Sequence, residues 1–383
     1  MGGKKFKSFE DLRGAELIEF LNTIPGTVLP GSYDELAPEE FGALFDVGIG
    51  AADVSSANVQ RRLGEIRAGS TGISQSLSLI SPGGWQTANA MEGVADAGQL
   101  PIPSVMNPSP DNRWGVFVTG SGEFIDVDDT ANASGYDLKS SGITVGIDYR
   151  VGPQFAVGLL AGYLDVGADL NNDGDVDVQG GRGAVYATWY DDGLYVDSII
   201  GGGYNSYDTR RGVLDDKARG DTEGLEFDGF LGAGYDFKRE RLTVGPTLSM
   251  QYTYVGVDSF TENGSIAPLA VDDNDSQSLR TRLGGRVAYD LKRGNATFRP
   301  ELRAAWHHEY LDDDRSIDSR FASGAGSIFE VNSPEIGRDA LSLSAGVTAE
   351  WSSRFSTYVF YDTQLARENY VLHSVSLGLR WSF

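Results

Sequence analysis

An acidic stretch between residues 169 and 177 carries the side chains best suited to bind a metal. Its oxygen-bearing side chains are Asp169, Asn171, Asp173, Asp175 and Asp177. With Gly174 at the sixth position, this spacing would suit a calcium-binding loop. The twelfth position is Gly180 instead of a bidentate glutamate, however, and Asn and Gly also favour the backbone of a hairpin loop. We therefore predict no metal site and keep calcium binding as the alternative interpretation of these five residues.

Three histidines are candidates for acid–base chemistry: His307, His308 and His373. The neighbouring Ser374 has the opposite strand parity to His373, so a serine–histidine pair there would need a different local geometry. His308 shares a strand face with Trp306, which is typical of an aromatic belt at a membrane interface. Adjacent acids in the long polar segments are interpreted as solvated charge. We predict no catalytic residue, no cofactor and no enzymatic activity.

Composition narrows the class of protein. The 383 residues carry a net charge of −24, which argues against a nucleic-acid partner. Cysteine is absent from the sequence, which excludes disulfides and thiol chemistry. The chain is 40% hydrophobic with a mean hydropathy of −0.25, and no stretch approaches the ~18 apolar residues of a membrane helix. A membrane barrel gives such an average because its apolar residues alternate with polar ones.

Alternation with period two runs from residue 113 to the end of the chain and predicts β-strands. Twelve are expected, at 113–125, 138–151, 154–168, 176–190, 194–209, 223–238, 241–257, 277–292, 296–311, 339–352, 355–366 and 370–383. Tight connections alternate with long polar segments, which lie at 126–137, 210–222, 258–276 and 312–338. Outer-membrane barrels combine short periplasmic turns with longer extracellular loops. The pattern predicts an all-β fold, a 12-stranded antiparallel transmembrane up-and-down β-barrel with both ends periplasmic.

Strand parity separates side chains that face lipid from side chains that face the lumen. Leu279, Leu283 and Val287 share one face of their strand, and charged residues occupy the other. An Arg or Lys on the lipid face costs about 2–4 kcal/mol near the membrane midplane. We therefore predict a polar lumen with the charges Glu226, Asp228, Arg280, Arg282, Arg286, Arg299, Glu301 and Arg303.

The segment before the barrel has a different pattern. Residues 1–69 are expected to be helical, with one helix opening at Pro38 and a second from about Asp53 to Ala68. Gly48 and Gly50 weaken the first of these helices.

Residues 70–112 are rich in Gly, Ser and Pro, which predicts an extended linker between the helical region and the barrel.

Charged residues follow Met1-Gly-Gly-Lys-Lys too early for a secretory signal, so we expect a fragment or a processed C-terminal product.

The chain ends on an aromatic residue with apolar residues at alternate positions before it: Val375, Leu377, Leu379, Trp381 and Phe383. This pattern resembles the C-terminal β-signal of bacterial outer-membrane barrels. The resemblance implies that the strand is the assembly signal read by the barrel assembly machinery. It also implies an outer-membrane location in contact with lipid.

A barrel over 113–383, preceded by a helix and a linker, resembles the translocator domain of autotransporters, the type V secretion proteins of Gram-negative bacteria. The matching segments are Val375-Ser-Leu-Gly-Leu-Arg-Trp-Ser-Phe383 and Trp114-Gly-Val-Phe-Val-Thr-Gly-Ser-Gly-Glu-Phe124. The resemblance implies a monomeric barrel that anchors in the outer membrane and serves export of its own upstream passenger.

In that family a helix commonly occupies the pore after export. The candidate pore-helix residues are Arg61, Arg62 and Arg67, which we expect to pair with lumen acids such as Glu226 and Asp228. The long linker leaves two alternatives for residues 1–69, a helical cap or a remnant of the passenger. For the whole chain the alternatives are a porin-like channel, because opposed charges also tune channels, a surface adhesin, and a soluble all-β protein, whose strands are usually shorter.

Overall fold

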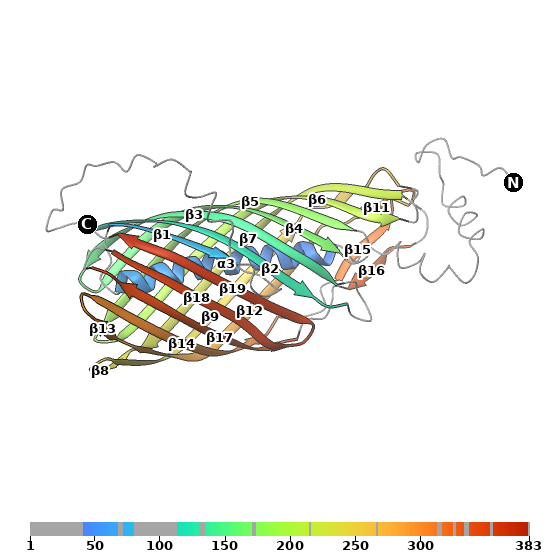
Figure 1. The fold of residues 1–383 in the computed structure, drawn as a ribbon. Helices are drawn as coiled ribbons and strands as arrows, with labels where there is room; N and C mark the ends of the chain where they lie inside the picture. The colour runs from blue at the N-terminus through green and yellow to red at the C-terminus, as the bar shows by residue number, and fades with distance from the viewer. Residues whose placement is uncertain are drawn as a thin grey trace, which may run out of the picture.

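Twelve long strands close into a barrel in the computed structural model of this protein (Figure 1). The structure describes residues 41–67, 72–79, 113–129, 135–170, 174–213, 216–265, 267–311, 316–324, 327–332, 337–352 and 355–381. The long strands are β2 (Trp114–Val127), β3 (Tyr136–Gly152), β4 (Phe155–Leu170), β5 (Asp175–Asp191), β6 (Leu194–Val213), β7 (Asp216–Tyr235), β9 (Leu242–Val257), β12 (Asn274–Tyr289), β14 (Ala296–Glu309), β17 (Asp339–Glu350), β18 (Phe355–Arg367) and β19 (Tyr370–Trp381).

Consecutive long strands pair antiparallel around the barrel, so the predicted fold class is confirmed. Two short strands, β8 (Phe237–Arg239) and β13 (Leu291–Arg293), extend the wall next to tight turns. A further tight turn, between β5 and β6, has positive φ at Asp192 and Gly193. Such a turn matches the right-handed twist of the strands it joins. We call this the short-turn end and the opposite end the long-loop end.

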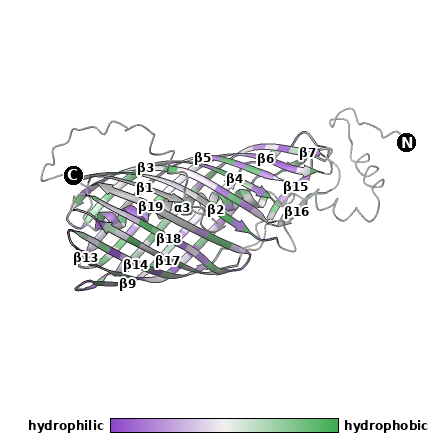
Figure 2. Ribbon diagram, in the orientation of Figure 1, coloured by the Kyte–Doolittle hydropathy of each residue, from purple (hydrophilic) through white to green (hydrophobic). Residues whose placement is uncertain are grey.

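Side chains alternate between the outer surface and the interior, as strand parity predicts. Leu231, Leu248, Leu283 and Leu302 are exposed on the outside. Their neighbours of opposite parity include the buried Glu301. Figure 2 shows hydrophobic and hydrophilic residues alternating along the strands.

The long-loop end carries a second sheet that sequence reasoning assigned to loops. It consists of β10 (Phe260–Thr261), β11 (Leu269–Val271), β15 (Ser316–Phe321) and β16 (Phe329–Asn332). Arg211, at the tip of β6, anchors its base by donating to both carboxylate oxygens of Glu262 at 3.1 and 2.6 Å, and both side chains are fully buried. The Glu262 carboxylate also accepts from the backbone N–H of Leu269 at 2.8 Å. Parts of the predicted loops 258–276 and 312–338 are therefore ordered.

The expected linker over 70–112 contains a strand. β1 (Gly72–Leu79) lies between β19 and β2, antiparallel to the first and parallel to the second. Only the far part of the seam between β2 and β19 is paired directly, from Phe124 opposite His373 to Val127 opposite Tyr370. The prediction of a linker is wrong for residues 72–79, because glycine and serine also occur in barrel strands. The remaining residues of that range, up to 112, lie outside the described part of the chain.

A single helix, α3 (Gly42–Arg67), replaces the two helices that the sequence predicts. Gly48 and Gly50 do not interrupt it, because packing inside the barrel offsets their low helix propensity. Among the described residues, no helix combines the length and the apolar character needed to cross a membrane.

Candidate functional site: the helix inside the lumen

Helix α3 runs along the inside of the barrel (Figure 1). It contacts β2 to β7, β9 and β12. Its first residues lie at the long-loop end beside Phe260, and its last residues lie near the short turns beside Asp197. The chain therefore enters the lumen from the long-loop end and descends toward the short-turn end.

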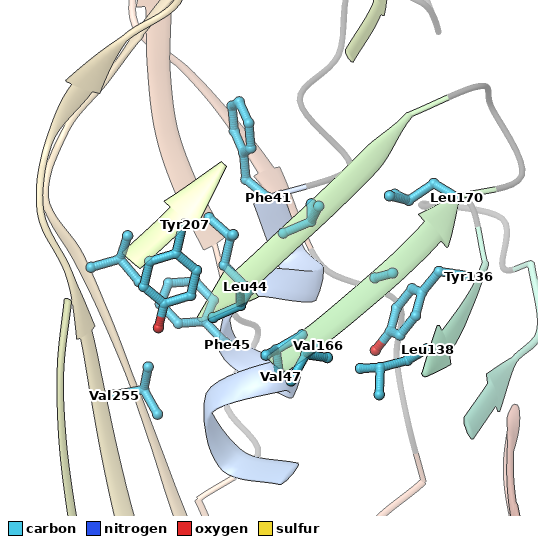
Figure 3. Packing of buried hydrophobic residues seen from close by; sticks show 14 of the residues in the cluster. Phe41, Leu44, Phe45, Val47, Tyr136, Leu138, Val166, Leu170, Tyr207 and Val255 are labelled. Carbon is cyan, nitrogen blue, oxygen red and sulfur yellow. The ribbon is translucent and has the colours of Figure 1, made fainter. Parts of the chain in front are cut away.

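The upper part of the helix is held by apolar contacts. Phe41, Leu44, Phe45 and Val47 are buried against the wall near the long-loop end (Figure 3). The ring of Phe41 meets the ring of Phe260 edge to face, with centroids 5.1 Å apart. Wall residues of the same cluster include Tyr136, Leu138, Val166, Leu170, Tyr207 and Val255. The second sheet thus packs on the same cluster as the start of the helix.

Gly48 brings the helix close to strand β9. A Cβ atom at this position would lie 2.8 Å from both methyl carbons of Val255, whereas one at Gly50 would meet nothing within 4 Å. The first glycine is therefore required by the close approach of the helix to the wall, and the second is not.

In the middle of the lumen, Asp53 of the helix pairs with two wall arginines. Arg280 donates to both carboxylate oxygens of Asp53 at 2.5 and 2.8 Å. Arg282 lies 3.8 Å from the same carboxylate. Gln251 donates to it as well, at 2.9 Å. Asp53 therefore compensates the charge of Arg280 inside the barrel.

Lower down, Arg62 of the helix makes a bidentate pair with Asp148 of β3. The Nε and Nη2 atoms donate to the two carboxylate oxygens at 2.7 and 3.1 Å. Glu65 accepts from Nη1 of the same guanidinium at 3.0 Å. Arg62 is only 2% exposed, and these two acids are the partners that compensate its buried charge. Gly115 makes room for the pair, because a Cβ there would lie 2.1 Å from Arg62 Nη2 and 2.3 Å from the Asp148 carboxylate.

The C-terminal end of the helix is fixed by a third ion pair. Arg67 donates to both carboxylate oxygens of Asp197 at 2.5 and 2.6 Å, and its guanidinium lies 4.0 Å from the centre of the Tyr195 ring. Arg150 donates to the backbone carbonyl of Ile66 at 2.9 Å. Cations at this end also interact favourably with the helix dipole.

A second apolar cluster surrounds the lower half of the helix. Val59, Leu63 and Ile66 are buried there, with Phe117 and Tyr186 among their wall partners. The helix is thus held at two apolar zones, with ion pairs between and below them. Water-sized spaces remain beside it, one of them lined by Gly50, Ser55, Thr144 and other residues.

The predicted pore-helix arginines all lie on α3, but their partners differ from the expected ones. Arg62 and Arg67 pair with Asp148 and Asp197 instead of Glu226 and Asp228. Arg61 lies 5.7 Å from the ring centre of Tyr358.

The two expected acids bind a wall arginine. Arg182 of β5 donates to Glu226 at 2.8 Å and also contacts Asp228. The prediction of their pairing with the helix is wrong because sequence parity shows which face a charge occupies but not its height or its position around the wall.

The remaining predicted lumen charges pair within the wall. Arg286 donates to Asp236 at 2.5 and 3.0 Å and lies 3.4 Å from Glu301. Arg303 contacts the same glutamate. Arg299 pairs with Asp290 at 2.5 Å.

The structure describes three of the five residues that could form a calcium-binding loop. Asn171 and Asp173 lie outside the described residues. Asp169 contacts Lys139 at 3.2 Å, and Asp175 and Asp177 lie 2.6 and 3.5 Å from Arg210. Within the described ranges, no group of three or more His, Asp or Glu side chains is placed to hold a metal ion. Basic partners thus compete with any cation for the three described acids.

The assembly-signal residues Val375, Leu377, Leu379 and Trp381 belong to β19. Phe383 lies outside the described residues. The backbone of β19 pairs with β18 along its length, with Phe355 opposite Trp381.

A serine–histidine contact occurs at a position that sequence reasoning did not weigh. The Ser342 hydroxyl lies 2.7 Å from His307 Nε2, and the Gln364 side-chain nitrogen lies 3.1 Å from His307 Nδ1. The three residues come from neighbouring strands, which only the barrel register brings together. His308 instead contacts Asp339 at 2.9 Å, and His373 contacts the Tyr361 hydroxyl at 2.7 Å.

Sequence reasoning missed Asp53, Asp148 and Asp197, the three acids that hold the helix. Asp148 and Asp197 have the lumen parity of their strands. An acid among small residues in a helix is also a recognisable signal. No sequence feature relates their heights in the barrel, so their partners were not predictable.

Comparison with known proteins identifies the architecture. The autotransporter β-domain family matches residues 116–362. The chain belongs to this family. It is therefore a translocator barrel of the outer membrane. The short-turn end is then periplasmic and the long-loop end extracellular.

The chain is also similar to part of a longer curated protein. The "Extracellular serine protease" of Serratia marcescens is 25% identical over 266 residues, which are 66% of this chain and 24% of that protein. This autotransporter chain thus spans about a quarter of the length of that curated relative.

Two solved structures share the fold. The translocator domain of the autotransporter NalP from Neisseria meningitidis has a TM-score of 0.57 at 14% identity and covers 70% of this chain and 88% of its own. The beta domain of the Bordetella autotransporter BrkA has a TM-score of 0.54 at 20% identity, with 70% and 98% covered.

Proposed function

We propose that the barrel anchors the chain in the outer membrane and that α3 is the plug left in its lumen after an upstream passenger has passed outward. The direction of the helix carries this proposal. Phe41, which directly precedes the helix, lies at the extracellular end, and Arg67 lies near the periplasmic end. Any passenger attached before Phe41 therefore continues from the extracellular side.

The proposed plug is held by specific contacts along its length. Apolar clusters enclose both halves, and three ion pairs join Asp53, Arg62 and Arg67 to the wall. A porin-like channel needs an open aqueous lumen. The helix fills this space, which favours a translocator over a channel.

Planar-bilayer recording of the full chain tests the plug. We expect a closed barrel in the full chain and a measurable conductance when D148N and D197N together remove the lower ion pairs. The matched control is D191N, which removes an acid that contacts Gln154 and not the helix. Large steady conductance of the unmodified chain would instead support the porin-like channel.

Protease treatment of intact cells tests the location of the helix. An antibody against residues 42–67 should still detect its epitope after digestion, because the wall encloses the helix. Loss of the epitope in cells whose outer membrane is intact would place the segment on the surface and contradict the plug.

We further propose that the barrel has no catalytic role of its own. The Ser342–His307–Gln364 contacts then serve as a hydrogen-bond chain across the wall. The proposed partners of the barrel are outer-membrane lipid, the barrel assembly machinery and the passenger. The assembly machinery would recognise strand β19, and the barrel would act as a monomer.

A further inference from the structure

Among the described residues, one strand, β1, lies in the wall between two of the twelve long strands. β1 lies between β2 and β19 over the periplasmic part of the seam, from Gly72 opposite Gly115 to Leu79 opposite Gly122 and Val375. Beyond β1, β2 and β19 pair directly, beginning with Phe124 opposite His373. The seam therefore forks.

The register on the two sides of the fork is continuous. Where β2 and β19 pair directly, the residue number rises by one along β2 as it falls by one along β19. The pairs run from Phe124 opposite His373 to Val127 opposite Tyr370. Across β1 the same relation holds, because Ser78 is the partner of both Ser121 and Ser376. If β1 were withdrawn, Ser121 and Ser376 would become direct partners without any slip of register.

The sequence of β1 fits the place it occupies. Ile73, Gln75, Leu77 and Leu79 alternate with a glycine and three serines. The register places the serine rows opposite Phe117, Thr119 and Ser121 of β2, whose side chains are buried inside the barrel. The register places the other row opposite the apolar positions of β19, with Leu77 opposite Leu377 and Leu79 opposite Val375. Period-two alternation in phase with both neighbours is what a barrel strand requires.

We propose that the seam between β2 and β19 is a strand-binding site with two closed states. In one state residues 72–79 occupy the seam, as in this structure. In the other they are withdrawn and β2 pairs with β19 along its full length. Both states satisfy the backbone groups of the wall, whereas an empty open seam would expose unpaired N–H and C=O groups to lipid.

The site would accept an extended segment that alternates apolar and small polar residues. Its present occupant begins five residues after the end of α3, so the bound strand also ties the periplasmic end of the helix to the wall. This inference concerns the wall alone and does not depend on the proposed export function.

Disulfide crosslinking across one row of serines tests the two states, since the native chain has no cysteine. The double variants are S78C/S376C, S78C/S121C and S121C/S376C. Neighbouring strands lie about 4.7–4.9 Å apart, and a disulfide needs Cα atoms within about 7 Å. With β1 bound, Ser121 and Ser376 are two strand spacings apart. We therefore expect the first two variants to crosslink in outer membranes and the third to stay reduced.

A second change should reverse this pattern. Adding S74P and S76P to S121C/S376C removes two N–H donors and blocks a central strand, because proline is tolerated only at sheet edges. We expect the S121C/S376C crosslink to rise from background to the level of the S78C pairs. The matched control S74A/S76A should leave it at background.

Folding of each variant is checked by its heat-dependent migration in a gel, which distinguishes a closed barrel from an unfolded chain. A folded proline variant that does not crosslink S121C to S376C would overturn the second closed state. If S121C/S376C formed a crosslink without the proline substitutions, and neither S78C/S376C nor S78C/S121C did, residues 72–79 would not occupy the seam.

Discussion

Arg62 and Asp148 are 86 residues apart in the sequence and meet inside the barrel through two hydrogen bonds of 2.7 and 3.1 Å. The pair joins the lumen helix to β3, at a point where Gly115 of β2 leaves space for both side chains. A bidentate arginine–carboxylate contact has a defined orientation as well as a favourable energy. Together with the other ion pairs, it therefore constrains both the depth and the rotation of α3 in the lumen.

Removing one partner of this pair should loosen the helix. D148N leaves the buried Arg62 with one acid, Glu65, and breaking a buried ion pair by removing one partner typically costs about 3–5 kcal/mol, an upper bound here because Glu65 remains. We expect faster hydrogen exchange in the amides of 59–67, while exchange in the strands stays unchanged.

A double-mutant cycle isolates the pair. R62Q combined with D148N removes both charges, so the double variant should lose less protection than the two single variants add up to. Additive losses would show that Arg62 and Asp148 do not act together in holding the helix.

Two glycines of the helix provide a matched comparison. G48A places a Cβ 2.8 Å from the methyl groups of Val255, while G50A meets nothing within 4 Å. Alanine favours a helix over glycine by about 1 kcal/mol. We expect G50A to slow hydrogen exchange in α3 and G48A to accelerate it. Equal protection in both variants would contradict the close approach of α3 to β9.

The Ser342–His307 contact should not hydrolyse esters. The Gln364 side-chain nitrogen lies 3.1 Å from His307 Nδ1, and a hydrogen bond donated by this amide to Nδ1 favours the tautomer with the imidazole proton on Nε2, facing the serine hydroxyl. A general base needs a free lone pair at that nitrogen. Hydrolysis of a short-chain nitrophenyl ester by the purified chain is therefore expected to equal that of the S342A variant. Activity that disappears in S342A would contradict this prediction.

Deletion of Phe383 should reduce the amount of barrel assembled in the outer membrane. The reason is the alternating apolar pattern of the last strand, which resembles an assembly signal. The measurement is the heat-modifiable fraction in isolated outer membranes, with deletion of an internal loop residue, Ser323, as the control. Normal assembly without Phe383 would remove that residue from the signal.

Much of the wall was predictable because its signal is local. Period-two alternation around Leu283 and Leu302 indicates which face meets lipid, and tight turns such as Asp192-Gly193 indicate where strands reverse. The helix of residues 53–67 was predictable for the same reason. Its continuation through Gly48 was not, because helix propensity there is overridden by packing against Val255.

The sequence by itself determined the twelve long strands, the polarity of their two faces and the presence of charges on the inner one, since each depends on the spacing of neighbouring residues. Tertiary structure alone decided that Arg62 meets Asp148 instead of Glu226, and that residues 72–79 enter the wall. These outcomes depend on the height at which each residue lies in the closed barrel. Strand register and stagger set that height, and they are properties of the whole sheet.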